Sequence, residues 1–405
     1  MNSFKNLENA ASETSDVAPH ISPHIHIDGR TLEGGGQLVR IALGLSALAG
    51  RPVTIDFIRG NRRGRTGLRG SHLAAVGILA EIGGSHVTND FVGARSITFT
   101  PPQAEKTSDP ATASPTPKGR YQRLNASLVP LDSVSPKSVY NIRTQTPGSI
   151  CLIYQALYPY MIHVGARTST KVVKVNIVGG TNGSGCPSYD YISQVIAPNF
   201  ARLVLPALSV KLHKRGWATG SLSMGEMSFF IRPLPTSESC FPEGLSPASR
   251  FPMIDVMSFE RGQVTRIDVT ALAPRDALPQ NERNGSCLTV LDYSSVLAGS
   301  ADGTNTVPIN THLTEVISHF CQIFLLLVAH TSNRFRIGPL AVKPSCLDSY
   351  MRDQIVVFEE LARLGNTSDH QHFRGEMTEL TEDRRYWTLH TETAQWVCRE
   401  MLFAE

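Results

Sequence analysis

The fold is decided by residues 24–50, which read HIHIDGRTLEGGGQLVRIALGLSALAG. The opening alternation of histidine and isoleucine predicts a β-strand that ends at Asp28, because successive side chains of a strand point to opposite faces. Beyond the glycines at 34–36, apolar residues recur every three or four positions up to Gly50, which predicts a helix. A strand therefore enters a helix through three glycines, and the free N–H groups at such a helix start bind anions.

The next segment carries five arginines within eleven residues and no carboxylate. They are Arg59, Arg62, Arg63, Arg65 and Arg69. Guanidinium groups without a counter-charge repel one another, so they require either full solvation or an anion such as phosphate. The segment lies between a predicted strand at 53–58 and a predicted helix at 72–82. Two anion-binding helix starts close together in the sequence indicate a polyphosphate or a nucleic-acid end as ligand.

Length and composition are those of a globular protein with one elaborated domain or two. The chain has 405 residues, of which 41% are hydrophobic and 18% charged. The net charge of +3 is too small to indicate nucleic-acid binding by itself, so the arginine cluster is the more informative feature. Seven scattered cysteines without close pairs favour reduced thiols over disulfides or a zinc site, which predicts a protein of the nucleus or the cytoplasm.

The first 23 residues carry charges of both signs and no long apolar run. We expect a disordered tail there, and neither a signal peptide nor a membrane anchor. The most apolar run, at 320–329, is much shorter than the about 20 residues that a membrane-spanning helix needs. A membrane role is therefore not expected.

Short strands and helices are expected to alternate along the rest of the chain, as in α/β or α+β proteins. The predicted strands are 53–58, 86–87, 96–100, 171–178, 264–273 and 288–292, and the predicted helices are 72–82, 150–161, 191–203, 313–329 and 355–364. Residues 101–137 are rich in Pro, Ser, Thr and Ala, which indicates a mobile loop.

Several polar residues on the predicted helices allow both a structural and a functional interpretation. Gln155 lies among apolar residues, and a buried amide without a partner costs roughly 1–3 kcal/mol, so it either has a partner or lies on the helix surface. Asp190 precedes the helix at 191–203, where a carboxylate also serves simply to stabilise the helix start. Asp353 and Gln354 precede the helix at 355–364 and allow the same interpretation.

The order of these motifs resembles the RNA 3′-terminal phosphate cyclase family. The opening match consists of Asp28-Gly29, Glu33-Gly34-Gly35-Gly36-Gln37, Arg40, Ile58-Arg59, Gly67-Leu68-Arg69 and His72-Leu73. Further along, the chain keeps the family residues Gln155, Gly179-Gly180-Thr181-Asn182, Pro187, Asp190, Tyr350, Asp353 and Gln354. The run His390-Thr391-Glu392-Thr393-Ala394 matches the family's nucleophile motif, at what the sequence predicts to be the end of a strand. Such an ordered set is far more specific than one glycine loop.

The resemblance implies an α/β (α+β) fold of repeated βαβαββ units, each a four-stranded sheet backed by two helices. It divides the chain into a tail at 1–23, a core at 24–236 and 309–405, and a reduced insert domain at 237–308. The chain departs from the family pattern in three places. Residues 214–226 lack the usual proline and glycine triplet, the insert is short, and the chain ends at Glu405, before the last strand expected of the family. We expect an altered loop, a reduced insert and a less stable final sheet.

The resemblance also implies a function, the ATP-dependent conversion of an RNA 3′-terminal phosphate to a 2′,3′-cyclic phosphate through AMP bound covalently to a histidine. Catalysis is then expected from His390, Arg40, Arg59 and Arg62, nucleotide binding from Gln155, Pro187, Tyr350, Met351, Arg352, Asp353 and Gln354, and RNA binding from Gln37, Arg69 and His72. Glu33 is expected to hold Mg²⁺ or Mn²⁺ against the phosphates. Arg63 and Arg65 are alternatives to Arg62, because this loop is one residue longer than usual.

Two other functions remain open. A eukaryotic branch of the family acts in ribosome assembly and rRNA processing as a catalytically inactive RNA-binding protein. That branch lacks the histidine that His390 matches, whereas the three departures are compatible with a chain that binds RNA without catalysis. The fold is also shared with enolpyruvyl transferases, in which the motif at His390 has no use.

Overall fold

The computed structural model describes most of the chain, with gaps. The described residues are 24–102, 127–168, 170, 172–219, 222–235, 251–254, 264–272, 288–292, 324–331, 347–364 and 387–403. The predicted tail at 1–23 lies outside them, as do residues 103–126 of the predicted loop and much of the predicted insert at 237–308.

The first repeated unit forms one four-stranded sheet in the order β1-β2-β4-β3. Its elements are β1 (Ile25–Asp28), α1 (Gly36–Ala49), β2 (Val53–Asp56), α2 (Gly70–Gly83), β3 (His86–Thr88) and β4 (Ile97–Thr100). β1 and β2 are parallel, as strands joined by a helix are, whereas β4 is antiparallel to β2 and β3. Ile25 and Ile27 are buried while His26 is exposed, as the alternation in the sequence predicts.

The second unit repeats this order of elements. It comprises β5 (Val139–Arg143), α3 (Ile150–Val164), β6 (Val173–Gly179), α4 (Tyr189–Tyr191), a π-helical turn (Ile192–Ile196), α5 (Ala197–Arg202), β7 (Leu208–Lys214) and β8 (Gly225–Ile231). The strand order β5-β6-β8-β7 is that of the first unit, and β5 and β6 are again parallel. The predicted repetition of βαβαββ units is therefore confirmed for these two units.

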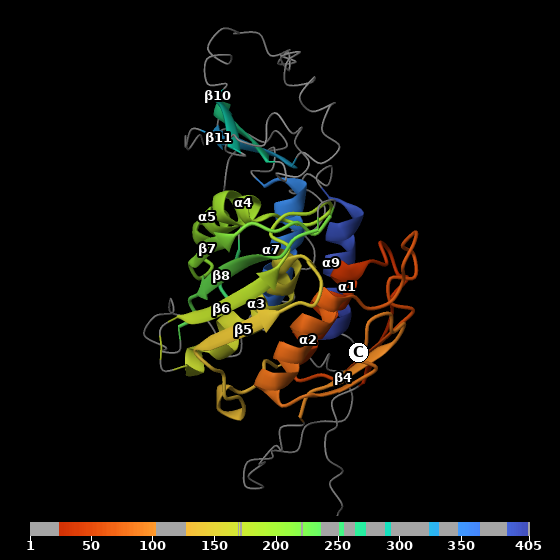
Figure 1. Cartoon of the computed structure of the whole chain (residues 1–405). Coiled ribbons are helices and arrows are strands. Elements are labelled where there is room, and N and C mark those ends of the chain that lie inside the picture. The colour runs from red at the N-terminus through yellow and green to blue at the C-terminus, as the bar shows by residue number, and fades with distance from the viewer. Residues whose placement is uncertain are drawn as a thin grey trace, which may run out of the picture.

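Helices of both units gather between the two sheets (Figure 1). α1 contacts α2, α3 and α9 (Leu389–Phe403), and α9 also contacts α7 (Ser349–Arg363). The approach of α1 to α3 is close, because a Cβ on Gly44 would lie 2.8 Å from the carbonyl oxygen of Ala156. The last described helix thus packs directly against the helix that follows the glycine loop.

Residues 127–137, the end of the predicted mobile loop, are attached to this helical layer. The N–H group of Val129 donates to the carbonyl oxygen of Leu48 at 2.9 Å, and the carbonyl oxygen of Val129 lies 2.9 Å from Nε2 of His163. Val134 is buried, with 6% of its surface exposed. Backbone hydrogen bonds and the burial of Val134 therefore attach this end of the segment to the packed unit.

A third sheet has the order β10-β9-β11 and consists of β9 (Val264–Leu272), β10 (Leu288–Asp292) and β11 (Phe324–Thr331). The first two confirm the strands predicted at 264–273 and 288–292. The helix predicted at 313–329 is wrong over β11, which pairs antiparallel with β9. A short apolar run is compatible with either state, and here the partner strand decides. This pairing joins 324–331 to strands of the predicted insert.

The segment that carries His390 is a helix, whereas the sequence predicts the end of a strand. α9 begins at Leu389, so His390 lies in its first turn. The hydroxyl oxygen of Thr388 accepts a hydrogen bond from the N–H group of Thr391 at 3.2 Å, as the oxygen of an N-cap residue does. The strand prediction is therefore wrong here, where the Thr388 cap and the hydrogen bond from Thr391 to Asp353 stabilise a helix start.

Candidate active site

The glycines at 34–36 let charged side chains converge on the start of α1. A Cβ on Gly36 would lie 2.8 Å from Nε2 of His72 and 3.0 Å from Nη1 of Arg40, and a Cβ on Gly35 would overlap the carboxylate of Glu33. α1 begins at Gly36 without a side-chain cap from the described residues, so its first N–H groups are available to an anion. The glycine loop is therefore a site of close approach rather than a flexible connection.

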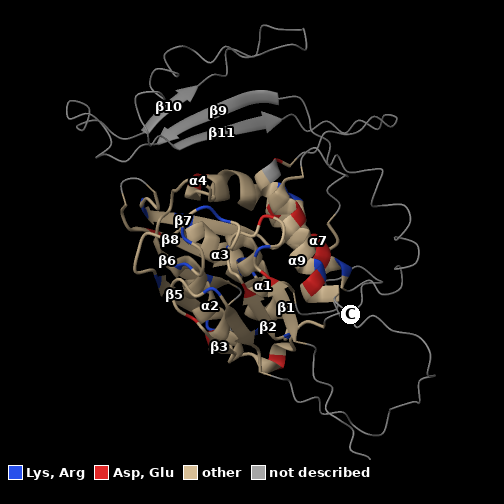
Figure 2. Ribbon diagram, turned by 90° about the vertical axis from the view of Figure 1, so that its right-hand side faces the viewer, with Lys and Arg blue, Asp and Glu red and all other residues tan. Residues whose placement is uncertain are grey.

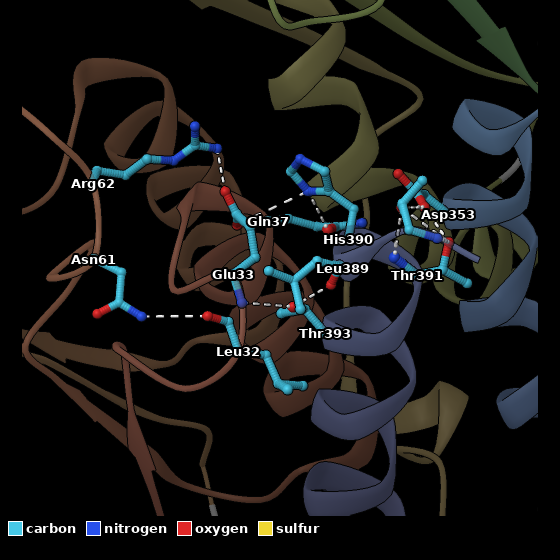
Figure 3. A network of polar contacts seen from close by, with 11 residues as sticks. Leu32, Glu33, Gln37, Asn61, Arg62, Asp353, Leu389, His390, Thr391 and Thr393 are labelled. Atoms are coloured by element: carbon cyan, nitrogen blue, oxygen red, sulfur yellow. Dashed lines mark hydrogen bonds and ion pairs between the residues drawn. The ribbon is translucent and has the colours of Figure 1, made fainter. Parts of the chain in front are cut away.

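His390 of α9 reaches this helix start and contacts Gln37 (Figure 3). Nδ1 of His390 lies 3.0 Å from the amide oxygen Oε1 of Gln37. An amide oxygen only accepts, so Nδ1 must carry the proton and donate. In the neutral imidazole the lone pair then lies on Nε2, which faces away from Gln37. Gln37 is 8% exposed, whereas the His390 side chain is 44% exposed. The buried Gln37 side chain therefore orients the imidazole ring of His390, which solvent can reach.

Glu33 lies between His390 and the loop at residues 59–69, which we call the arginine loop. Its Oε1 forms an ion pair with Arg62, and its Oε2 lies 3.9 Å from Nδ1 of His390. Oε2 is buried and has no hydrogen-bond partner within the described part of the chain. The backbone N–H group of Glu33 donates to the hydroxyl of Thr393 at 3.2 Å, which ties the glycine loop to α9 a second time.

Asp353 of α7 holds the first turn of α9 in place. Its Oδ1 accepts hydrogen bonds from the hydroxyls of Thr391 at 2.5 Å and Thr388 at 3.1 Å. Burial raises the pKa of Asp353, and these hydrogen bonds oppose the shift. The structure thus connects Asp353 to His390 through the helix start rather than by a direct hydrogen bond.

The predicted phosphate-binding arginines differ in their surroundings. Arg40 is partly buried, and among the described residues it has neither a hydrogen bond nor an ion pair; burial lowers its pKa to about 10, so it stays charged at pH 7. Arg59 and Arg69 each donate to the carbonyl oxygen of Arg65, at 3.1 and 3.2 Å. Burial, followed by the nearby charge of Arg69, lowers the pKa of Arg59. Arg62 instead pairs with Glu33.

His72 is a buried, neutral imidazole at the centre of this positive charge. Its Nδ1 accepts the backbone N–H group of Arg69 at 3.1 Å, so its proton lies on Nε2, the atom nearest Gly36. Burial and the neighbouring charges of Arg40, Arg59 and Arg69 lower its pKa to about 3. His72 therefore presents a hydrogen-bond donor without adding charge.

A folded-state pKa of about 3 at His72 predicts a specific acid sensitivity. Between pH 6.5 and 3 the unfolded chain binds a proton at this histidine that the folded protein excludes, so stability falls as the pH falls. The slope from this group is about 1.4 kcal/mol per pH unit. Urea unfolding at several pH values is expected to show the stability advantage of the native protein over His72→Gln shrinking below pH 6.5. His213→Gln controls for the loss of one histidine. If the difference in unfolding free energy between native protein and His72→Gln stays constant down to pH 4.5, burial does not lower the pKa of His72.

A pocket beside Gln37 and Arg40 is lined by residues of α3 and α7, together with Ile196 of the π-helical turn and Phe200 of α5. Three of the predicted nucleotide-binding residues line it, namely Gln155, Asp353 and Gln354. Its other walls are mainly apolar and aromatic, from Ile41, Tyr154, Tyr158, Pro159, Ile196, Phe200, Val357 and Phe358. Gln155 is only partly buried, so it needs no internal partner and is free to face a ligand.

Four other predicted nucleotide-binding residues do not line this pocket. Met351 is fully buried in the core, and Arg352 is buried in an ion pair with Glu359 at 2.9 Å. Tyr350 is 71% exposed, with its ring edge-on to Tyr191. Pro187 precedes α4 and is partly exposed.

Arg215 and Asp190 form an ion pair that the sequence did not reveal. Arg215 donates to both carboxylate oxygens of Asp190 at 2.8 Å and to Oδ1 of Asn182 at 3.3 Å. Next to it, a Cβ on Gly216 would lie 2.1 Å from the backbone nitrogen of Gly225, so the altered loop still brings two chain segments into contact. The only sequence signal was the family match of Asp190, because its partner comes from a distant loop.

The described ranges contain neither a cluster of metal ligands nor a membrane-spanning helix. No group of three or more His, Cys, Asp or Glu side chains is placed to hold a metal ion in the described ranges. Within the same ranges no helix is long and apolar enough to cross a membrane.

Known proteins that are similar to this chain carry the same name as the family model that matches it. A family model described as RNA 3′-terminal phosphate cyclase matches residues 31–405. A protein of Drosophila melanogaster named RNA 3′-terminal phosphate cyclase is 24% identical, over 85% of this chain and 87% of its own length. One from Dictyostelium discoideum, named probable RNA 3′-terminal phosphate cyclase, is 26% identical over 84% of this chain and 71% of its own. One from Koribacter versatilis, also named RNA 3′-terminal phosphate cyclase, is 29% identical, over 61% of this chain and 54% of its own length.

Proposed function

The chain belongs to the RNA 3′-terminal phosphate cyclase family, and we propose that it performs the reaction of that name, converting an RNA 3′-terminal phosphate to a 2′,3′-cyclic phosphate with ATP. The observation that carries the proposal is the contact of His390 with Gln37, which leaves Nε2 as the nucleophilic nitrogen beside the open start of α1. A histidine with only a structural role would have no need of an accessible, oriented lone pair.

In the first step, the Nε2 lone pair of His390 attacks the α-phosphorus of ATP. The bond from that phosphorus to the bridging oxygen breaks, and pyrophosphate leaves with the electron pair. AMP is then bound through Nε2, while Nδ1 keeps its proton. The amide oxygen of Gln37 at 3.0 Å stabilises the positive charge that develops on the ring.

In the second step, an oxygen of the RNA 3′-terminal phosphate attacks the phosphorus of the bound AMP, and His390 leaves as neutral imidazole. Imidazole suits both roles, because it is nucleophilic when neutral and a good leaving group once it carries positive charge. The terminal 2′-hydroxyl then attacks the 3′-phosphorus, its proton passes to the departing phosphate, and AMP is released with closure of the ring.

The charges of the substrates are matched by the groups around α1. Arg40, Arg59 and Arg69 would bind phosphate oxygens together with the N–H groups of the helix start. His72 would donate a hydrogen bond from Nε2 to a phosphate oxygen without adding positive charge to the site, because its imidazole is neutral. The side chains of Gln155 and Gln354 at the pocket would contact the nucleotide.

Glu33 fits a divalent cation at the phosphates. Its Oε2 is a buried carboxylate oxygen without a hydrogen-bond partner in the described residues, the kind of atom that a cation satisfies. Mg²⁺ is commonly held by one carboxylate together with substrate phosphates and water, so a single acidic ligand suffices. The ion, Mg²⁺ or Mn²⁺, would neutralise phosphate charge.

The test is transfer of label from ATP to the protein. Native protein is incubated with ATP labelled either at the α- or at the γ-phosphate, with Mg²⁺ or Mn²⁺, and separated by denaturing electrophoresis. Acid-labile label from the α-position alone supports AMP on a histidine. Absence of label on protein shown to be folded would reject the enzyme and leave an RNA-binding relative as the better account.

A further inference from the structure

Four large apolar side chains are exposed on the loops that surround the arginines. Leu32, Phe57, Phe91 and Val92 expose between 41% and 62% of their surface. The loops that carry them are joined by backbone hydrogen bonds, from Ile58 to Arg95 at 2.8 Å and from Gly93 to Leu68 at 2.9 Å. We call these four side chains the Phe57 surface.

Phe57 is held in a fixed, outward position. The guanidinium carbon of Arg30 lies 3.9 Å from the centre of its ring, so one face of the ring is covered by a cation. Arg30 is itself fixed by an ion pair with Asp28 at 2.6 Å. The ring is nevertheless 52% exposed, which leaves room for a second planar group.

The backbone around Phe57 adopts conformations that bulky residues avoid. Phe57 has φ +49°, and Leu32 and Arg59 have φ +52° and +57°. Each such residue costs on the order of 1–3 kcal/mol and persists only where the surroundings hold it. The surroundings are visible here, because the side chain of Asn61 donates to the carbonyl oxygens of Arg30 and Leu32, and the N–H group of Gly60 donates to the carbonyl oxygen of Phe57. The fold thus maintains strained backbone that presents apolar side chains to solvent.

The charge around this surface identifies its partner. Arg63 and Arg65 are exposed and have no ion pair among the described residues, and both lie within the same loop as Phe57. Acidic residues are instead conspicuous on α7 and α9 (Figure 2). An exposed aromatic ring on the same loop as unpaired, exposed arginines matches single-stranded nucleic acid, whose bases stack on rings while its phosphates bind cations.

The loops are also continuous with the proposed active site. Asn61 and Arg62 point from the arginine loop towards the loop that holds Leu32 and Glu33 (Figure 3). We propose that the Phe57 surface binds the RNA strand on the 5′ side of the reacting terminus, with a base stacked on the open face of Phe57 and backbone phosphates on Arg63 and Arg65. This inference rests on the proposed function for the choice of an RNA 3′ end.

The test is a double-mutant cycle between protein and RNA, measured as binding without ATP. The probe is a single-stranded eight-residue RNA with a 3′-phosphate and a 5′ fluorophore, and a series of probes carries one abasic site at each position. Phe57→Ala is expected to weaken binding about tenfold, as loss of one base stack does. One abasic position is expected to weaken binding to the native protein similarly but to have little further effect in Phe57→Ala.

Salt dependence and matched variants separate stacking from charge. The slope of affinity against salt is expected to be unchanged in Phe57→Ala and smaller in the double variant Arg63→Ala/Arg65→Ala, because only phosphate contacts release counterions. Phe57→Trp is expected to bind like the native protein. Val204→Ala is the matched control, since Val204 is also exposed (72%) with φ +61° but follows α5, away from the arginine loop.

Several results would overturn the proposal. They are equal RNA affinity of native protein and Phe57→Ala, abasic effects that are the same in both proteins, or no RNA binding by native protein. A change in self-association of Phe57→Ala with unchanged RNA affinity would assign the surface to a protein contact instead. Because binding is measured without ATP, these failures are distinct from a failure of label transfer to His390.

Discussion

Replacement of His390 by alanine is expected to abolish transfer of label from α-labelled ATP to the protein, with a loss of at least about 10³-fold. The other histidine of the described site is not expected to replace the proposed nucleophile, because the lone pair on Nδ1 of His72 is engaged by the N–H group of Arg69. His390→Asn is expected to show the same loss, although its amide N–H group retains a donor for Gln37. Gel-based labelling and overall cyclisation of a 3′-phosphorylated RNA are the measurements.

The control for this substitution is His86→Ala, which removes an exposed histidine of β3. It is expected to be labelled like the native protein. Thermal unfolding of all three variants shows whether each is folded. Label retained by folded His390→Ala would mean that another residue is the nucleophile and that the Gln37 contact has a structural purpose.

Replacement of Arg40 by methionine is expected to lower the rate of label transfer by about 10²- to 10³-fold, the effect of removing one oxyanion-stabilising donor. Arg40 lines the pocket, is partly buried and has no counter-ion in the described part of the structure, so its charge is available for a phosphate. Because an unpaired, partly buried cation destabilises a folded protein, the same substitution is expected to leave the melting temperature unchanged or raise it.

A lower rate of label transfer without a lower melting temperature distinguishes a functional arginine from a structural one. Arg40→Lys is expected to recover part of the rate, since lysine keeps the charge but loses the fork of donors. Arg202→Ala, at the exposed end of α5, is the matched surface control. A large fall in the melting temperature of Arg40→Met would show that the side chain supports the fold and would remove the argument for a phosphate ligand.

The repeated units were predictable because their signals are local. Alternating residues before Asp28, the glycines at 34–36 and the helical spacing up to Gly50 all act within a few turns of chain. β11 (Phe324–Thr331) was not predictable in this way, since its strand state depends on pairing with β9 about 60 residues earlier in the sequence. The helix at His390 was missed for a similar reason, because Asp353 from another helix stabilises its first turn.

The site was only partly accessible from sequence. Resemblance pointed to Glu33, Gln37 and His390, but not to the hydrogen bond that assigns the proton of His390 to Nδ1. Helical spacing alone already distinguishes residues of α7, because Met351 falls on the same face as the buried Ile355 and Phe358. A motif matched residue by residue does not carry that distinction. Both Met351 and Arg352 are predicted to bind nucleotide, and the structure places Met351 in the core and Arg352 in an ion pair with Glu359.

The contact between Gln37 and His390 spans 353 residues of sequence. During synthesis on the ribosome, the chain therefore acquires the glycine loop, the arginines and α3 long before His390, the proposed nucleophile, emerges. A nascent or prematurely terminated chain that lacks α9 would have groups able to hold phosphates but nothing to react with them. Under the proposed mechanism, transfer of AMP to the protein becomes possible only after α9 has docked on α1.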